Sequence, residues 1–310
     1  MKRILPLILF ISSQISFSQH LTEPFLQDIV SQFPNVRDVA ISPDGNDVMF
    51  SAQSIMGNLS TIISIKKDGN TWSKPEVASF SGKYFDLEPF FSLDGLTLYF
   101  VSTRPEDSTS NEAKDFDIWY VERETLKSKW SEAKNLGSPI NTEHGEFYPS
   151  LAENGNFYFT RDNPTLGRKD DLYVSEFING TYSEPQPLPD TINSEGYEYN
   201  AFIASDESYI LFGSYNRKDG FGSGDMYISH HSENGWTQAK NLGNKINTDK
   251  MDYCPFVLDD TLYFTSKLDS TNTNFESSLS IEELLNEFNR YDNGSSRLYK
   301  VNLKAILTKE

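Results

Sequence analysis

A unit of about 50 residues recurs along the chain, and this repeat constrains the fold more than any other feature. Each copy has an apolar segment, a turn, and a second apolar segment that ends in Phe. The clearest turn is Leu93-Asp94-Gly95, and Asp-Gly between two apolar segments is a strong hairpin signal. The corresponding turns of the five copies contain Asp44, Asp94, Asn154, Asp206 and Asp259.

The rest of each copy predicts two further strands. A third segment opens in most copies with Asp, an apolar residue and an aromatic residue, as in Asp117-Ile118-Trp119. Fourth strands are expected at Trp72, Trp130, Tyr182 and Trp236. Four strands in a unit of this length are typical of a β-propeller blade, so we predict an all-β, five-bladed β-propeller, with six blades as the alternative. The predicted blades span about 36–80, 86–140, 146–192, 198–246 and 252–303.

The two ends of the repeat predict how the ring closes. The fifth copy stops after its third strand, near Leu303, whereas residues 22–30 precede the first copy as a surplus segment. This segment is similar to residues 183–191, which are expected to form a fourth strand. We therefore expect residues 22–30 to complete the last blade, because closing the ring removes exposed strand edges.

Two insertions interrupt the repeat. Residues 267–297 contain Ser280-Ile281-Glu282-Glu283, a capping box, followed by apolar residues at helical spacing. We expect a short amphipathic helix near 281–291 that lies on the propeller as an insertion in the last blade. Residues 106–114 are polar and are expected to form a loop.

The best copy of the repeat resembles the TolB-type, WD-like propeller repeat. It runs from Ser92-Leu93-Asp94-Gly95 to Arg104 and continues with Asp117-Ile118-Trp119, and the resemblance covers nearly all of residues 19–310. The resemblance implies the propeller fold but no particular activity. TolB carries a small α/β domain before its propeller, and related peptidases carry a catalytic domain after it. Neither domain, nor a Gly-x-Ser-x-Gly nucleophile motif, is found in this sequence.

The first 18 residues have the layout of a secretory signal. Lys2 and Arg3 precede an apolar run over residues 4–11, and Ser16 and Ser18 are small residues before a cleavage point at Gln19. We therefore predict a cleaved signal peptide over 1–18 and a single propeller domain over 19–310, exported to a periplasm or secreted. No later segment has the length and apolarity of a transmembrane helix.

Charge and cysteine content narrow the classes of partner. The chain has 27 Lys and Arg against 45 Asp and Glu, a net charge of −18, so nucleic acid is not an expected partner. Cys254 is the single cysteine, which rules out an intrachain disulfide, and we expect a buried thiol rather than a nucleophile. A protein or cell-envelope component is the expected partner, with carbohydrate as a further possibility.

Polar positions that recur in the repeat should meet on one face of the ring, around the mouth of the channel. The binding candidates there are Asp86, Glu146, Tyr148, Glu198, Asn200 and Asp252. A second set, expected to hold the blades together by charge-assisted hydrogen bonds, comprises Arg104, Asp117, Arg161, Asp171, Arg217 and Asp225. The set is incomplete in the first blade, which has Gln53 and Thr61, and in the fifth, which has Arg297 in place of Asp. This asymmetry predicts where a site would open.

Two functions follow from these candidates. The first is an exported binding or scaffold protein without catalytic residues. The second is a glycan-active hydrolase or lyase that uses Asp86, Glu146, Glu198 or Asp252 in the funnel. The pairing of these acids distinguishes the two functions. If each acid is paired with a neighbouring Arg, no general acid with a raised pKa is expected, which favours the binding protein. We predict no cofactor and no metal centre, although four carboxylates around a pore would suit Ca²⁺.

Overall fold

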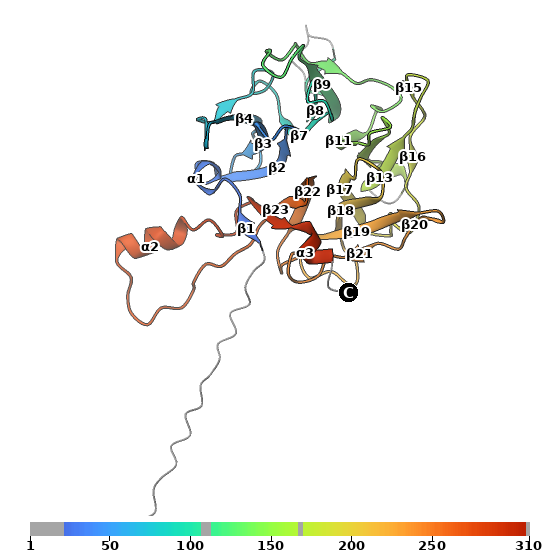
Figure 1. The fold of residues 1–310 in the computed structure, drawn as a ribbon. Helices are drawn as coiled ribbons and strands as arrows, with labels where there is room; N and C mark the ends of the chain where they lie inside the picture. Colours follow the sequence, from blue (N-terminus) through green and yellow to red (C-terminus); the bar gives the residue numbers. More distant parts are fainter. Residues whose placement is uncertain (1–21, 107–112, 167–169, 308–310) are drawn as a thin grey trace, which may run out of the picture.

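The computed structural model describes residues 22–106, 113–166 and 170–307, and these form a five-bladed β-propeller (Figure 1). Each blade is an antiparallel sheet of four principal strands, as the repeat predicts. The predicted signal segment 1–18 and most of the 106–114 insertion lie outside the described residues. None of the helices in the described ranges has the length and hydropathy needed to cross a bilayer.

The two inner strands of each blade follow the hairpins that the Asp-Gly-like turns predict. The innermost strands are β2 (Asn35–Ile41), β7 (Asp86–Phe91), β11 (Gly145–Leu151), β17 (Tyr197–Ile203) and β22 (Asp252–Leu258). The second strands are β3 (Asp47–Gln53), β8 (Thr97–Ser102), β12 (Phe157–Asp162), β18 (Tyr209–Tyr215) and β23 (Thr261–Ser266). The Phe near the end of each second strand is fully buried between sheets, at positions Phe50, Phe100, Phe159, Phe212 and Phe264.

The two outer strands differ in length. The third strands are β4 (Ser60–Asp68), β9 (Asp117–Glu122), β13 (Asp170–Ser175), β19 (Asp225–Ser232) and β24 (Arg297–Asn302). The outermost strands have two residues each: β6 (Glu76–Val77), β10 (Lys134–Asn135), β16 (Gln186–Pro187), β21 (Lys240–Asn241) and β1 (Glu23–Pro24). A short 3₁₀ helix, η1 (Pro164–Leu166), precedes β13.

The fourth strands lie later in the chain than the Trp positions predict. Residues near these positions instead form short hairpin segments beyond the blades, namely β5 (Thr71–Trp72), β14 (Phe177–Ile178) with β15 (Thr181–Tyr182), and β20 (Gly235–Trp236). Trp130 is in neither strand and packs beside the core of the first two blades. In each of these four blades, the outermost strand that pairs with the sheet therefore comes a few residues after the Trp or Tyr position.

The N-terminal segment closes the ring, but with a shorter strand than predicted. In β1, Glu23 lies opposite Lys300 and Pro24 opposite Tyr299 of β24, so the first residues described complete the last blade. The strand was expected over 22–30, yet it ends at Pro24 because Leu26 adopts a left-handed conformation and begins helix α1 (Gln27–Val30). Val30, the last residue of this helix, packs in the hydrophobic core.

The last blade carries two further helices. Helix α2 (Ile281–Phe288) has the predicted capping box, with Ser280 and Glu283 each bonding the backbone of the other. The expectation that it lies on the propeller is wrong: none of its residues is buried, and it stands away from the ring on an extended arm (Figure 1). Helix α3 (Leu303–Leu307) ends the described chain and packs Leu303 into the core.

Candidate functional site: the central channel

Four of the predicted binding candidates lie in the seams between blades. Each begins or nearly begins an innermost strand and is fully buried, and each accepts hydrogen bonds from a Ser or Thr of the preceding loop. For example, Glu146 Oε1 accepts from Thr142 Oγ1 at 2.6 Å. We call this set the seam acids: Asp86, Glu146, Glu198 and Asp252.

Three of the seam acids are neutralised by the predicted Arg positions. The N–O distances are 2.8 Å for Arg104–Asp86, 2.9 Å for Arg161–Glu146 and 2.9 Å for Arg217–Glu198. Each guanidinium also donates to a carbonyl of the loop that links two blades, such as Ile140 O at 2.8 Å from Arg161. Each pair therefore ties a loop to the next blade, and the seam acids hold blades together rather than face the channel.

The Asp residues that open the third strands make a separate set of contacts. Asp117 accepts from Asn135 at 2.8 Å, and Asp225 accepts from Asn241 at 3.0 Å, so each ties the third strand to its outermost strand. Asp171 is buried at the same position. The Arg members of this predicted set make their charge-assisted hydrogen bonds with the seam acids, whereas Asp117 and Asp225 bond the outermost strand of their own blade.

Asp252 differs from the other seam acids because it forms no ion pair with an Arg in the described ranges. It accepts from Thr248, and its Oδ1 atom is buried without a hydrogen-bond partner among the described residues. Burial raises the pKa of Asp252 to about 6. The carboxyl is therefore partly protonated at a pH at which an unfolded chain would be fully ionised.

A pH dependence of stability follows for Asp252. Because its pKa is higher in the folded chain, the folded state binds more protons between about pH 4 and 6. The free energy of unfolding should fall as the pH rises through this window, by about 3 kcal/mol from this group. Asp252→Asn, which keeps an acceptor for Thr248, should flatten this slope in urea unfolding at pH 4.5 to 7. An unchanged slope would show that Asp252 is ionised throughout.

Five other residues, one from each blade, converge at the axis of the propeller. Each innermost strand contains a β-bulge, and the residue at the bulge has a positive φ of 50 to 59°. A non-glycine residue in this conformation costs energy, and five such residues in corresponding positions indicate a shared structural role. We call them the channel ring: Asp38, Glu88, Tyr148, Asn200 and Cys254.

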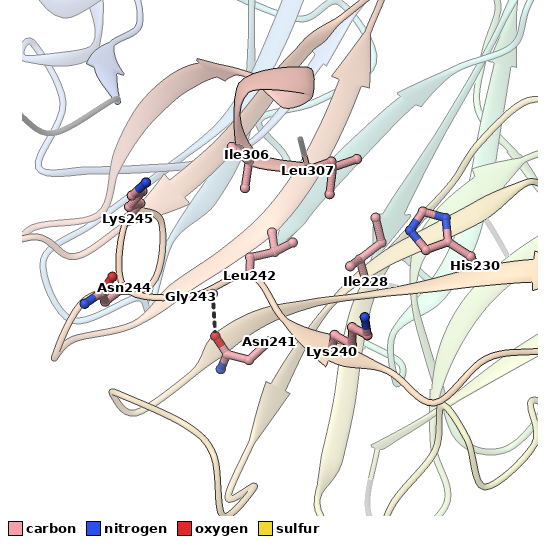
Figure 2. A pocket seen from close by; sticks show the side chains of 10 residues that line it. All are labelled: Ile228, His230, Lys240, Asn241, Leu242, Gly243, Asn244, Lys245, Ile306 and Leu307. Atoms are coloured by element: carbon pink, nitrogen blue, oxygen red, sulfur yellow. Dashed lines mark hydrogen bonds between the residues drawn. The ribbon is translucent and has the colours of Figure 1, made fainter. Parts of the chain in front are cut away.

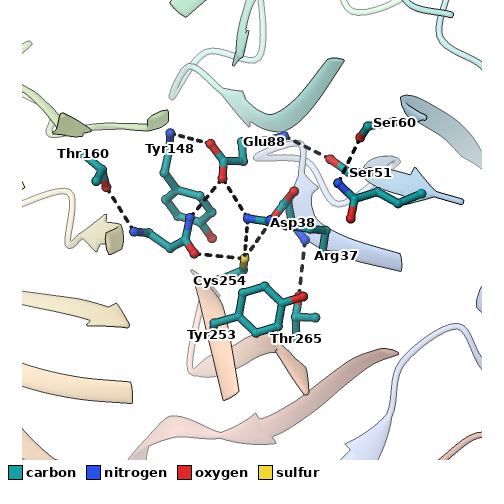
Figure 3. A network of polar contacts seen from close by, with 12 residues as sticks. Arg37, Asp38, Ser51, Ser60, Glu88, Tyr148, Thr160, Tyr253, Cys254 and Thr265 are labelled. Carbon is teal, nitrogen blue, oxygen red and sulfur yellow. Dashed lines mark hydrogen bonds and ion pairs between the residues drawn. The ribbon is translucent and has the colours of Figure 1, made fainter. Parts of the chain in front are cut away.

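Hydrogen bonds join the residues of the channel ring, some between neighbouring blades and some between blades that are not neighbours (Figure 3). Asn200 Nδ2 donates to Glu88 Oε1 at 3.1 Å, and the backbone N–H of Tyr148 donates to Glu88 Oε2 at 2.8 Å. Tyr148 Oη donates to the carbonyl of Pro255 at 2.9 Å, and the Cys254 thiol donates to Asp38 Oδ1 at 2.7 Å. The Asn200–Glu88 and Tyr148–Pro255 contacts join blades that are not adjacent, and together with the other bonds they make the ring one connected polar network.

Arg37 is the cation of this network. Its Nε lies 2.6 Å from Asp38 Oδ1, its Nη2 lies 2.8 Å from Glu88 Oε1, and its guanidinium stacks 5.2 Å from the ring centre of Tyr253. Burial raises the pKa of Glu88 to about 7, even though Arg37 opposes the shift. Burial also raises the pKa of the Cys254 thiol, which is therefore a hydrogen-bond donor and not a thiolate nucleophile.

Aromatic side chains close the channel on one side of the ring. Phe90, Phe202 and Phe256 follow the bulges by two residues, and Phe256 contacts both others with ring centres 6.4 and 5.7 Å apart. All three are buried. A hollow of about 410 Å³ on this side is lined by these Phe side chains and by no residue of the channel ring. Glu88 and Asn200 of the ring line a hollow at the opposite end.

Two hollows open at that end. The mouth hollow, of about 290 Å³, lies over the channel ring and is lined by Arg37, Glu88, Phe147, Thr160, Asp162, Asp170, Tyr199, Asn200, Met251 and Tyr253. The seam hollow, of about 890 Å³, lies between the first and last blades and shares Arg37, Met251 and Tyr253 with it. Gln53 and Arg297 line the seam hollow, so a cavity does open where the repeat is asymmetric.

A third hollow, of about 350 Å³, lies away from the channel between β19, β21 and α3 (Figure 2).

The sequence interpretation found part of this site and missed the rest. Tyr148 and Asn200, two of its binding candidates, belong to the channel ring. It missed Arg37, Asp38 and Glu88. The signal that could have found them is position: each ring residue stands two places after the seam-acid position, and its type changes from copy to copy.

The described residues contain no group of three His, Cys, Asp or Glu side chains arranged to hold a metal ion. The seam acids occupy separate seams, so a Ca²⁺ ion shared among them stays a prediction without a common site to support it.

Comparison with known proteins shows the fold. No protein-family model matches the chain, and no curated protein is significantly similar to it in sequence. Among solved structures, TolB from Acinetobacter baumannii is 15% identical over 74% of this chain, with a TM-score of 0.44, and this match covers only 51% of that protein. A GH43 endo-arabinanase from Bacillus licheniformis is 14% identical over 87% of this chain and 94% of its own, with a TM-score of 0.53. At this identity the likeness to the endo-arabinanase shows a common β-propeller fold and nothing further.

Proposed function

We propose that the chain is an exported β-propeller that binds a protein, peptide or cell-envelope component at its channel mouth. The observation that carries this proposal is that most of the buried acids are in ion pairs with Arg. Arg37 pairs with both Asp38 and Glu88, and three of the seam acids each pair with an Arg of their own seam. An Arg partner fixes the position of a carboxylate and favours its ionised form, although burial still raises the pKa of both Glu88 and Glu146 to about 7.

The lining of the mouth hollow supports binding. It combines apolar surface from Phe147 and Met251 with polar groups from Thr160 and Asp162. The side chain of Tyr199 adds an aromatic ring to the lining. A concave site with mixed lining and a few converging polar groups is the usual form of a binding pocket.

Crosslinking tests the proposed surface. A photoreactive residue at Met251, which lines the mouth hollow, should crosslink a component of an envelope extract that mass spectrometry identifies. The control position is Leu93, which is half-exposed at the other end of the channel. Equal labelling at both positions, or no labelling at Met251, would overturn the proposal.

A glycan-active hydrolase remains the second candidate, on one specific observation. Asp38 and Glu88 lie together in the channel, and a pKa of about 7 would suit Glu88 as a general acid. The fold is shared with an endo-arabinanase, which by itself implies no activity. Release of reducing sugar from arabinan by the native chain, lost in Glu88→Gln, would replace the binding proposal with this one. We expect no release above that of Glu88→Gln.

A further inference from the structure

The seam between the last and first blades contains an Arg, as three of the other seams do, but it has no seam acid. In those three seams an Arg is neutralised by a seam acid. Here Val36 stands at the acid position, and Arg297 of β24 supplies the guanidinium. Its Nη1 donates to the carbonyls of Phe33 at 3.2 Å and Pro34 at 2.8 Å, as the other Arg groups do to their own loops.

Arg297 is a buried cation, and no carboxylate in the described part of the chain forms an ion pair with it. Its Nε is buried and has no hydrogen-bond partner among the described residues. The neighbours that act on its charge are Tyr291 and Tyr299, and burial lowers the pKa of Arg297 from its ordinary value. A buried charge that is not compensated is costly, and an anion close to it would recover that cost.

The seam hollow beside Arg297 is free of acidic residues. Twenty described residues line it, and none is Asp or Glu, in a chain with 45 acids and 27 bases. Its cations are Arg37, Lys267 and Arg297, and Arg37 is already held by Asp38 and Glu88. The hollow is therefore a positive site on a strongly negative protein, which favours an anionic ligand.

The side chains at the rim of the seam hollow indicate which kind of molecule would present the anionic group. Ile55 and Met56 line it and are 78% and 81% exposed, so two large apolar side chains stand beside the cations. Apolar side chains next to Lys and Arg match a peptide with alternating apolar and acidic residues. We propose that the seam hollow binds a carboxylate-bearing peptide segment of a partner protein, through Lys267 and Arg297. This inference rests on the proposed binding function and specifies its ligand.

Peptide binding tests this inference. The probe is a fluorescent hexapeptide with blocked termini that alternates leucine with glutamate, and its counterpart has glutamine in place of glutamate. The native chain should bind the glutamate peptide at least about tenfold more tightly, and raising the salt concentration should weaken binding because the attraction is between charges. Equal affinity for the two peptides, or no binding of the glutamate peptide, would overturn the inference.

A charge reversal locates the site. Lys267→Glu changes an exposed residue of the hollow and should weaken binding of the glutamate peptide about tenfold or more. Lys74→Glu makes the same change at an exposed residue that does not line the hollow and should leave binding within about twofold. An equal loss of affinity in the two variants would show that the peptide does not bind in the seam hollow. Met251 lines both hollows, so crosslinking there reports a partner in either of them, whereas the peptide assay reports the seam hollow alone. Crosslinking at Met251 without binding of the glutamate peptide would therefore overturn this inference and leave the binding proposal standing.

Discussion

Arg37→Met should lower the free energy of unfolding by about 3–5 kcal/mol at pH 7, the usual cost of removing one partner from a buried ion pair. Arg37 neutralises Asp38 and Glu88, which are 1% and 3% exposed. Without the guanidinium, two buried carboxyl groups face one another across the channel with no cation between them. Urea unfolding followed by tryptophan fluorescence measures the loss.

Two further variants show whether charge causes the loss. Arg290→Met removes a cation from the more exposed pair with Asp292 and should cost less than about 1 kcal/mol. The triple variant Arg37→Met, Asp38→Asn, Glu88→Gln removes the cation together with both acids and should regain most of the stability. If Arg37→Met costs no more than Arg290→Met, the channel ring does not depend on its cation.

The repeat made most of the fold predictable from the sequence. An Asp-Gly-like turn between apolar strands has a local physical cause, and five copies of the same signal reinforce one another. The seam acids and their Arg partners were found for the same reason, since a contact needed in every seam recurs in the sequence. Repetition therefore identified what holds the propeller together.

The channel ring was harder to predict because the residue type at its position changes from one copy of the repeat to the next. Asp38, Glu88, Tyr148, Asn200 and Cys254 share a backbone conformation but not a residue type. The bulge that turns each of them into the channel leaves no common signal in the sequence. Arg37 was missed because its counterparts in the other blades are apolar or aromatic, so no column of cations marks it.

Helix α2 shows a second limit of sequence patterns. The capping box and the apolar spacing correctly predict a helix, because both act within a few residues. They do not specify what the apolar face packs against. The side chains of Ile281, Leu285 and Phe288 are all exposed, so the expected packing on the propeller does not form.

Removal of residues 1–31 should cost about 6 kcal/mol or more, which is comparable with the whole stability of many domains. The deletion takes Val30 out of the core, together with Phe25, Leu26 and Ile29, which pack against it. It also strips β1 from β24 and exposes the edge of the last blade. Thermal unfolding and size-exclusion chromatography should show a much lower midpoint and self-association.

The matched control is removal of residues 1–21, which precede β1 and leave the closing strand and α1 in place. This shorter deletion should leave the midpoint unchanged. Val30→Ala, which trims one fully buried side chain, should fall between the two deletions, at a cost of about 2 kcal/mol. A graded loss across the three variants means that the first and last blades depend on this segment to close the ring. Equal midpoints for the two deletions would mean that other contacts between the first and last blades are enough to close the ring, such as the hydrogen bonds from Arg297 to the carbonyls of Phe33 and Pro34, whose residues both deletions retain.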